Sequence, residues 1–431
     1  MLAGFGAAQA QAHMGLVGGR PARIAERAAA LTASLSAMDA AGANGAFVTI
    51  LTTDAASREA VVRTHAGEER AVLNAGSMDY LGLSQHPAVV AAVTDAVSEH
   101  GSCLTNSRAL CGSGGVHREL EAELAGYFGK EAALLMPAGW LACAAPLKGL
   151  AKPCDVIFID AHAHDSLAAG AKLSGARVVR FRTGDAAHLE SLLKTHRAGA
   201  ADALIVTEYV FSVDGRVMDV ASFRRLADEH GCLLVVDVAH GLGTVSTLLD
   251  DVRAADLVVG TFSKTLVSQG GFVVASRPLI NYLSAYGFVF TASLATPSAA
   301  AALAALRVLR DEPWRVAALE RNVAAARARL RARGCRVAER GGPLLHVVAG
   351  DGGDGTAMAA WRAVFEGGLY VHPVLFPMAA RGSGGLRVTL GAGMDAAALD
   401  TLVDVVAAAA VAVATPGQAP EGGAATLTAA H

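Results

Sequence analysis

Short apolar runs alternate with longer stretches of helical periodicity between about residues 72 and 309. Most of these runs are uninterrupted valine, isoleucine and leucine, which is typical of parallel strands buried on both faces. The alternation predicts an α/β fold, with a mostly parallel sheet covered by helices on both sides. The strands predicted in this region are 132–136, 156–159, 178–181, 203–207, 233–236, 257–259 and 271–275.

The rest of the chain predicts an N-terminal arm and a second, smaller domain. The arm contains a helix over 23–38 and a β-prone patch over 46–52. The chain ends in a tail with prolines and paired glycines, which we expect to be disordered. The predicted borders are 1–75 for the arm, 76–310 for the large domain, 311–414 for an α+β C-terminal domain and 415–431 for the tail. The elements predicted in the C-terminal domain are a helix over 315–333, strands over 344–348, 369–371 and 386–390, and a closing helix ending near residue 413.

Composition and charge narrow the class of protein. The 36 basic and 39 acidic residues leave a net charge of −3, which offers no electrostatic footprint for nucleic acid or an anionic membrane. The longest apolar run, 402–414, contains Asp404 and is shorter than the roughly 18 residues that a membrane span needs. We expect no nucleic-acid partner and no membrane span. Because residues 1–19 lack the features of a secretory signal, we expect a cytoplasmic protein, in which the six cysteines are reduced thiols.

The most informative segment is the run from Gly260 to Lys264, directly after a predicted buried strand. Burial penalises a charged amine, so a lysine in this position either reaches water or has a lowered pKa and acts as a nucleophile. A Schiff-base lysine requires the second property. The hydroxyl groups of Thr261 and Ser263 would suit a phosphate group. The alternative for this pentapeptide alone is a solvated lysine after a strand.

A second polar segment, Asp237 to His240, follows the predicted strand 233–236. Ligands of open α/β sheets bind at the carboxyl ends of the strands, where the side chains of Asp237 and His240 should lie. A buried carboxylate needs a cation or several donors, and the protonated ring nitrogen of pyridoxal phosphate (PLP) is such a partner. The alternative is that Asp237 caps the following helix.

A third segment, from Asp160 to Ser166, contains two histidines after another predicted strand. The His162, His164 and Asp165 side chains resemble part of a zinc ligand set, whereas a single histidine could instead stack on an aromatic cofactor. A metal site would need further ligands with suitable spacing, and the rest of the chain offers only the isolated His240. We therefore favour the stacking role and expect no metal.

Between about residues 77 and 390, the order of these and other segments resembles the α-oxoamine synthases, PLP-dependent transferases of aminotransferase fold type I. Each fragment is short, and their shared order makes the resemblance specific. The run 290–294, together with 272–274, looks most similar to the serine palmitoyltransferase branch, and the family also includes the 8-amino-7-oxononanoate synthases. The matching fragments are Asp79 to Leu83 with His86 and Pro87; Ser107 and Arg108 with Gly112, His117, Leu120 and Glu121; Gly139 and Trp140; His164 to Ser166; Ser212 to Gly215; Asp237 to His240; Thr261 to Lys264 with Gly270 and Gly271; Phe290 to Leu294; and Leu386 with Arg387.

The resemblance implies PLP as the cofactor and a catalytic set around its ring. Lys264 would form a Schiff base with PLP, Asp237 would pair with the pyridinium nitrogen, and His164 would stack on the ring. His240 and Ser212 would lie beside the phenolic oxygen.

The resemblance also implies a phosphate site that two subunits share. Backbone N–H groups of Gly139 and Trp140 at a helix N-terminus would bind the phosphate, because such an end attracts anions. Thr261 would join them, and Thr291 and Ala292 of the partner subunit would complete the site. A homodimer with shared active sites is therefore expected.

The activity implied is an acyl transfer with loss of CO₂. A small α-amino acid, held through its carboxylate by Arg387, would condense with an acyl thioester of CoA or acyl carrier protein to give an α-amino ketone. Another PLP enzyme of this fold, an aminotransferase or a C–C lyase, is an alternative. A non-catalytic partner of a heterodimer is a further alternative, which the presence of Lys264 and Asp237 disfavours.

The chain departs from the family pattern at several positions, most of which we expect on the substrate side of the cofactor. Cofactor binding is therefore expected, while the amino acid and the acyl chain are not predicted. The departures are Met78, the run 102–106, Cys143, Thr183 with Gly184, Val238, and Gly393 with Met394.

Overall fold

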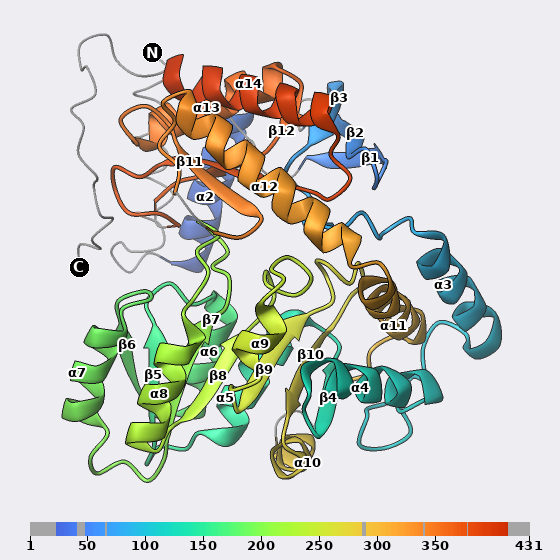
Figure 1. Cartoon of the computed structure of the whole chain (residues 1–431), viewed down its shortest axis with the longest axis vertical. Coiled ribbons are helices and arrows are strands. Elements are labelled where there is room, and N and C mark those ends of the chain that lie inside the picture. The colour runs from blue at the N-terminus through green and yellow to red at the C-terminus, as the bar shows by residue number, and fades with distance from the viewer. Residues whose placement is uncertain are drawn as a thin grey trace. The chain divides into compact units, whose positions relative to one another are not determined.

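The computed structural model describes residues 23–40, 48–64, 67–286, 290–338, 341–376 and 378–412. The chain folds into two compact units (Figure 1). One unit spans Met78–Glu320, and the other combines the residues up to Ser77 with those from Arg321 onward. The predicted tail at 415–431 and the first two residues of the β-prone patch lie outside the described residues.

A seven-stranded sheet forms the centre of the larger unit, as the sequence predicts. Only β10 runs antiparallel to its neighbours, and the other pairs are parallel. In sheet order the strands are β4 (Ala132–Met136), β10 (Gly271–Ala275), β9 (Leu257–Thr261), β8 (Leu233–Asp237), β7 (Ala203–Glu208), β5 (Val156–Asp160) and β6 (Arg177–Phe181). The α/β class and the mostly parallel sheet are thus confirmed.

Four strands continue beyond their predicted ends, and each of them ends on a polar residue. β5, β7 and β8 each end one residue later, on an acid, and β9 ends on Thr261. The side chains of these end residues are at least nine-tenths buried, including Asp160, Glu208 and Asp237. The carboxyl edge of the parallel strands therefore presents polar groups in an otherwise apolar sheet, which is where such folds bind ligands.

Helices cover both faces of this sheet (Figure 1). α5 (Gly139–Leu150), α6 (Asp165–Ser174) and α10 (Arg277–Tyr286) share one buried apolar cluster with alternate strand residues. On the opposite face, α8 (Val220–His230) packs its Phe223 ring 5.6 Å from Phe181 of β6. The remaining helices of this unit are α3 (Pro87–His100), α4 (Gly115–Phe128), α7 (Ala186–His196), α9 (Leu248–Val252) and α11 (Thr296–Asp311).

The smaller unit contains two sheets. The first has the order β1 (Thr49–Thr53), β2 (Glu59–Arg63), β3 (Glu69–Asn74) and β12 (Leu369–Tyr370). The second has the order β11 (Leu344–Val348), β14 (Gly385–Thr389) and β13 (His372–Val374). The described helices that lie wholly within it are α2 (Ile24–Ala40), α13 (Asp354–Glu366) and α14 (Ala396–Ala412).

The division of the chain differs from the predicted borders in two respects. The N-terminal segment is not separate, because β3 pairs in parallel with β12 and the Nη1 atom of Arg58 donates to the Thr389 carbonyl at 2.8 Å. The border after residue 310 moves into α12 (Trp314–Ala332), which is one continuous helix. Its first turns stay with the larger unit, where Glu320 accepts a hydrogen bond from the Ser246 N–H. Among the described helices, none is long and apolar enough to cross a membrane.

Candidate active site

A pocket with a volume of about 200 Å³ opens at the carboxyl ends of the central strands of the larger unit. It lies beside the N-terminus of α5, and all its lining residues belong to this unit. The predicted cofactor residues that it brings together are Gly139, Trp140, His164, Asp237, His240, Thr261 and Lys264. Its lining also includes Cys143, Ser166, Glu208, Ala239 and Ser263.

Lys264 is placed in the pocket by a turn that follows β9. The hydroxyl groups of Thr261 and Ser263 are 2.8 Å apart, and the Thr261 hydroxyl also donates to the Gly270 carbonyl at 3.1 Å. Gly270 has a φ of +105°, and a Cβ atom there would lie 2.9 Å from the Met136 carbonyl oxygen. Only glycine fits this left-handed and crowded position, so Gly270 fixes the return of the chain into β10.

The N-terminus of α5 can hold the phosphate of PLP. Ala138 occupies the N-cap and has no side-chain acceptor for the first N–H groups of the helix. A Cβ atom on Gly139 would lie 2.4 Å from the Thr261 hydroxyl oxygen, so glycine permits close approach of the helix end to that hydroxyl. Uncapped N–H groups next to the hydroxyls of Thr261 and Ser263 suit an anion, and the residues present therefore fit the cofactor.

Asp237 lies at the inner wall of the pocket with 3% of its surface exposed. Its Oδ1 atom accepts from the Ala239 N–H at 2.8 Å, and its Oδ2 atom accepts from the Cys143 thiol at 3.3 Å. The carboxylate thus closes a turn directly after β8 and does not cap a helix, because the next helix begins only at Leu248. This arrangement corrects the helix-cap alternative.

Cys143 lies beside Asp237 and not on the substrate side, where most of the departures were expected. Burial is the largest effect on its thiol and the Asp237 charge is the second, and both raise the pKa of Cys143 well above its ordinary value. The thiol therefore stays protonated and can donate to the carboxylate. Val238, another departure, is fully buried and lies outside the residues that line the pocket.

His164 directly precedes α6, and both its imidazole and its backbone form hydrogen bonds. Its Nδ1 atom lies 2.7 Å from the Ser166 hydroxyl oxygen, within hydrogen-bond distance, and its backbone N–H donates to the Oε1 atom of Glu208 at 2.6 Å. Within the described residues, no group of three or more histidine, cysteine or acidic side chains could hold a metal ion. The Asp160 carboxylate instead accepts from the Thr183 hydroxyl at 2.7 Å and the Gly184 N–H at 3.1 Å.

Tyr80, which contacts a lining residue, and Glu208, which lines the pocket, were not assigned a role from the sequence. The Tyr80 hydroxyl lies 2.7 Å from Nδ1 of His240, and both side chains are buried. Glu208 lies opposite Asp237 in the paired strands β7 and β8. The available signal for Glu208 was its position, because it directly follows the predicted strand 203–207 just as Asp237 follows 233–236.

The remaining predicted site residues lie elsewhere. Ser212 is part of the turn after β7, outside the residues that line the pocket. Arg387 belongs to the smaller unit, on β14, where its Nη2 atom lies 3.5 Å from Nδ1 of His372. Burial, with the Arg387 charge as a second cause, lowers the pKa of His372 to about 4.

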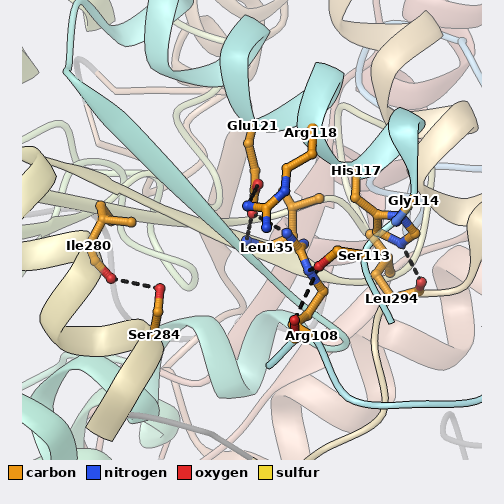
Figure 2. Close-up of polar contacts among 10 residues, drawn as sticks. All are labelled: Arg108, Ser113, Gly114, His117, Arg118, Glu121, Leu135, Ile280, Ser284 and Leu294. Carbon is orange, nitrogen blue, oxygen red and sulfur yellow. Dashed lines mark hydrogen bonds and ion pairs between the residues drawn. The ribbon is translucent and has the colours of Figure 1, made fainter. Parts of the chain in front are cut away.

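Thr291 and Ala292 directly precede a short segment that hydrogen-bonds α4 through Leu294, and Figure 2 shows this contact within a buried polar network. The His117 ring hydrogen-bonds the Leu294 carbonyl at 2.7 Å, and Ala292 forms a β-bridge with Ser107.

Glu121 is the centre of the neighbouring ion pairs in the same network. Its carboxylate accepts from Nη2 of Arg108 at 2.8 Å and from Nη1 of Arg118 at 3.1 Å. It also accepts from the N–H of Leu135 in β4 at 3.3 Å. The loop around Arg108 is therefore tied to both the sheet and α4.

Comparison with known proteins gives one consistent family. The family model of aminotransferase class I and II matches residues 70–406. The chain is 40% identical over 372 residues to the 8-amino-7-oxononanoate synthase of Methylobacterium sp. (strain 4-46), covering 86% of this chain and 93% of that protein. It is 42% identical over 335 residues to the synthase of Methylobacterium nodulans, covering 77% and 86%.

Solved structures agree with these relatives. The serine palmitoyltransferase of Sphingomonas wittichii has a TM-score of 0.84 at 28% identity, covering 91% of this chain and 99% of that one. The enzyme from S. paucimobilis, solved with a bound PLP adduct, has a TM-score of 0.84 at 27% identity with the same coverage.

The chain belongs to the aminotransferase class I and II family, as an α-oxoamine synthase. Its fold is that of fold type I PLP enzymes and its cofactor is PLP, so both predictions are confirmed. The individual roles predicted for the site residues remain predictions.

Proposed function

We propose that this enzyme condenses a small α-amino acid with an acyl thioester, releasing CO₂ and the free thiol and forming an α-amino ketone. The amino acid loses its carboxylate and its Cα gains the acyl group, while the thioester sulfur leaves with a proton. One observation carries the proposal. Lys264, Asp237 and His164 line one pocket in a chain that is 40% identical to an 8-amino-7-oxononanoate synthase.

Each of these residues has a distinct task. PLP, when bound, supplies an electron sink for the charge that develops at the amino-acid Cα. Asp237 holds a proton on the pyridine nitrogen, and the Lys264 amine removes the Cα proton as a general base and returns a proton to Cα after CO₂ has left. His164 supports the face of the ring, while the N–H groups of Gly139 and Trp140 anchor the phosphate.

The substrates are proposed by class. Arg387 holds the amino-acid carboxylate through a bidentate pair, which orients the bonds at Cα. The acyl donor is a thioester of CoA or of acyl carrier protein.

We also propose a homodimer in which Thr291 and Ala292 of the partner subunit complete each phosphate site. The polar network around Glu121 and His117 supports this assignment, because it holds the presenting segment in a defined position. An interface of roughly 2,000 Å² or more is expected. Sedimentation of the purified enzyme checks it, and an active monomer would contradict it.

A substrate screen tests the proposed activity. Purified enzyme with PLP is mixed with each small amino acid and a series of acyl-CoA thioesters, and free thiol is measured. At least one pair should release thiol only when both substrates are present, and Lys264→Ala should abolish the release. Keto-acid formation from the amino acid without thiol release would instead indicate an aminotransferase, and aldehyde release a C–C lyase.

A further inference from the structure

The pocket contains a second buried acid for which the proposed reaction has no task. Glu208 is 2% exposed, and it lies opposite Asp237 in the parallel strand pair. We propose that Glu208 serves this site as a neutral carboxylic acid, which fixes the start of α6 and leaves the negative charge of the pocket wall on Asp237. Its task toward PLP rests on the proposed function, whereas its protonation state does not.

Hydrogen bonds distinguish the two acids. Asp237 accepts from two donors, the Ala239 N–H and the Cys143 thiol. Among the described residues, Glu208 accepts from one donor, the His164 N–H. Donors favour the ionised form of a carboxyl group, so the pair is more stable with the charge on Asp237 and the proton on Glu208.

The charges that face Glu208 from neighbouring elements support the same assignment. Burial is the largest effect and the Asp237 charge on β8 is the second, and together they raise the pKa of Glu208 well above its usual range. Asp160 on β5 acts in the same direction. The His164 N–H and the Lys264 amine act in the opposite direction without reversing the shift. A carboxylate at the paired position of the neighbouring strand repels a second buried charge, so Glu208 is held in its neutral form.

A neutral Glu208 acts as a positioning residue. Its Oε1 atom still accepts from the backbone of His164, which keeps that imidazole at the pocket. Because Glu208 retains the proton, Asp237 stays available as the anion for the pyridine nitrogen. The opposite distribution would place a neutral acid beside the ring nitrogen and weaken that pairing.

Infrared difference spectroscopy tests the protonation state directly. Spectra of the purified enzyme and of Glu208→Gln are subtracted at neutral pH, in H₂O and in D₂O. A protonated carboxylic C=O band that is absent from the variant and shifts in D₂O is the expected result. A carboxylate band alone in the difference spectrum would overturn the proposal.

The Asp237→Asn variant provides a second measurement that does not require Glu208→Gln to fold. Replacing the Asp237 charge by a neutral amide removes the second-largest cause of the raised pKa. The protonated band of the enzyme should therefore titrate at a lower pH in Asp237→Asn than in the wild type. A purely structural Glu208 with no electrostatic link to Asp237 would show no such shift, and that result would also reject the proposal.

Cofactor binding tests the task separately from the protonation. Glu208→Gln keeps a neutral acceptor for the His164 N–H, so its dissociation constant for PLP should stay within about threefold of the wild type. Glu208→Asp is the matched control, because a shorter acid retains the chemistry but not the reach, and it should weaken PLP binding more. If the wild-type enzyme shows the infrared band but Glu208→Gln loses PLP, the positioning task is wrong. Absence of thiol release from the wild-type enzyme would instead contradict the proposed function and would not affect the assignment of Glu208.

Discussion

The Cys143 thiol donates to the Oδ2 atom of Asp237 across 3.3 Å, at the inner wall of the pocket. This contact joins a departure from the family pattern to the carboxylate that is proposed to pair with PLP. The thiol can donate only while it is protonated, and burial together with the adjacent charge raises its pKa well above the ordinary value. Because the thiolate is the reactive form, Cys143 should be chemically inert in the folded protein.

Alkylation rates should separate Cys143 from the exposed cysteines. Raising the pH normally speeds alkylation by forming thiolate, and a raised pKa moves that increase to higher pH. At about pH 8, iodoacetamide should therefore modify Cys143 at least about tenfold more slowly than Cys103 or Cys111, which are exposed. Peptide mass spectrometry over time gives each rate. Equal rates at the buried and exposed cysteines would show that the thiol is accessible and ionised.

Replacing Asp237 should separate cofactor binding from turnover. Asp237→Asn keeps the shape of the side chain but cannot hold a proton on the pyridine nitrogen, so PLP becomes a weaker electron sink. We expect PLP to remain bound, because the phosphate contacts and Lys264 are unchanged, and kcat to fall by about a hundredfold or more. Absorbance of bound PLP and thiol release measure the two properties. Near-wild-type turnover would contradict the task given to Asp237.

The Glu121 network should contribute strongly to the stability of the larger unit. Glu121→Ala leaves the Arg108 guanidinium, with 14% of its side chain exposed, without its anion, at a cost of about 3–5 kcal/mol. Arg118→Ala is the matched control, because that side chain is 68% exposed and its removal should cost less than about 1 kcal/mol. The thermal unfolding midpoints of the two variants are compared. Similar midpoints would show that the buried Glu121–Arg108 pair does not stabilise the larger unit.

Arg387 should determine the affinity for the amino acid. His372 cannot replace its charge, because a pKa of about 4 keeps that ring neutral at neutral pH. Arg387→Ala should raise the KM for the amino acid and lower kcat/KM by about a hundredfold, equivalent to about 2.7 kcal/mol. Arg387→Lys should restore little, since an ammonium group lacks the bidentate fork.

The control for this prediction is the PLP content, which should be unchanged in both variants. Unaltered amino-acid kinetics in Arg387→Ala would show that another residue holds the carboxylate.

The sheet of the larger unit could be predicted from the sequence because its strands are unusually plain signals. The predicted strands 203–207 and 233–236 each begin with four consecutive apolar residues, and each is a central strand in the structure. The polar residues at their ends also follow from the pattern. Chain order then places Lys264, Asp237 and His164 on the same edge of one sheet, because the carboxyl ends of parallel strands meet there.

Long-range pairings could not be predicted in the same way. β3 pairs with β12, nearly 300 residues further along the chain, and the short strand β12 carries no pattern that identifies its partner. The contact between Cys143 and Asp237 could not be predicted either, because it depends on how α5 packs against the sheet. Glu208 was visible as a strand end, but its proximity to Asp237 required the order of the strands.

The stoichiometry of CO₂ and thiol release tests the central claim most directly. The enzyme is given its amino acid labelled at the carboxyl carbon together with an acyl-CoA thioester, and labelled CO₂, free thiol and product are measured in the same reaction. A decarboxylative condensation releases one CO₂ and one thiol for each α-amino ketone formed, and Lys264→Ala forms none of the three. Thiol release without labelled CO₂, or CO₂ release without an acylated product, would contradict the assignment.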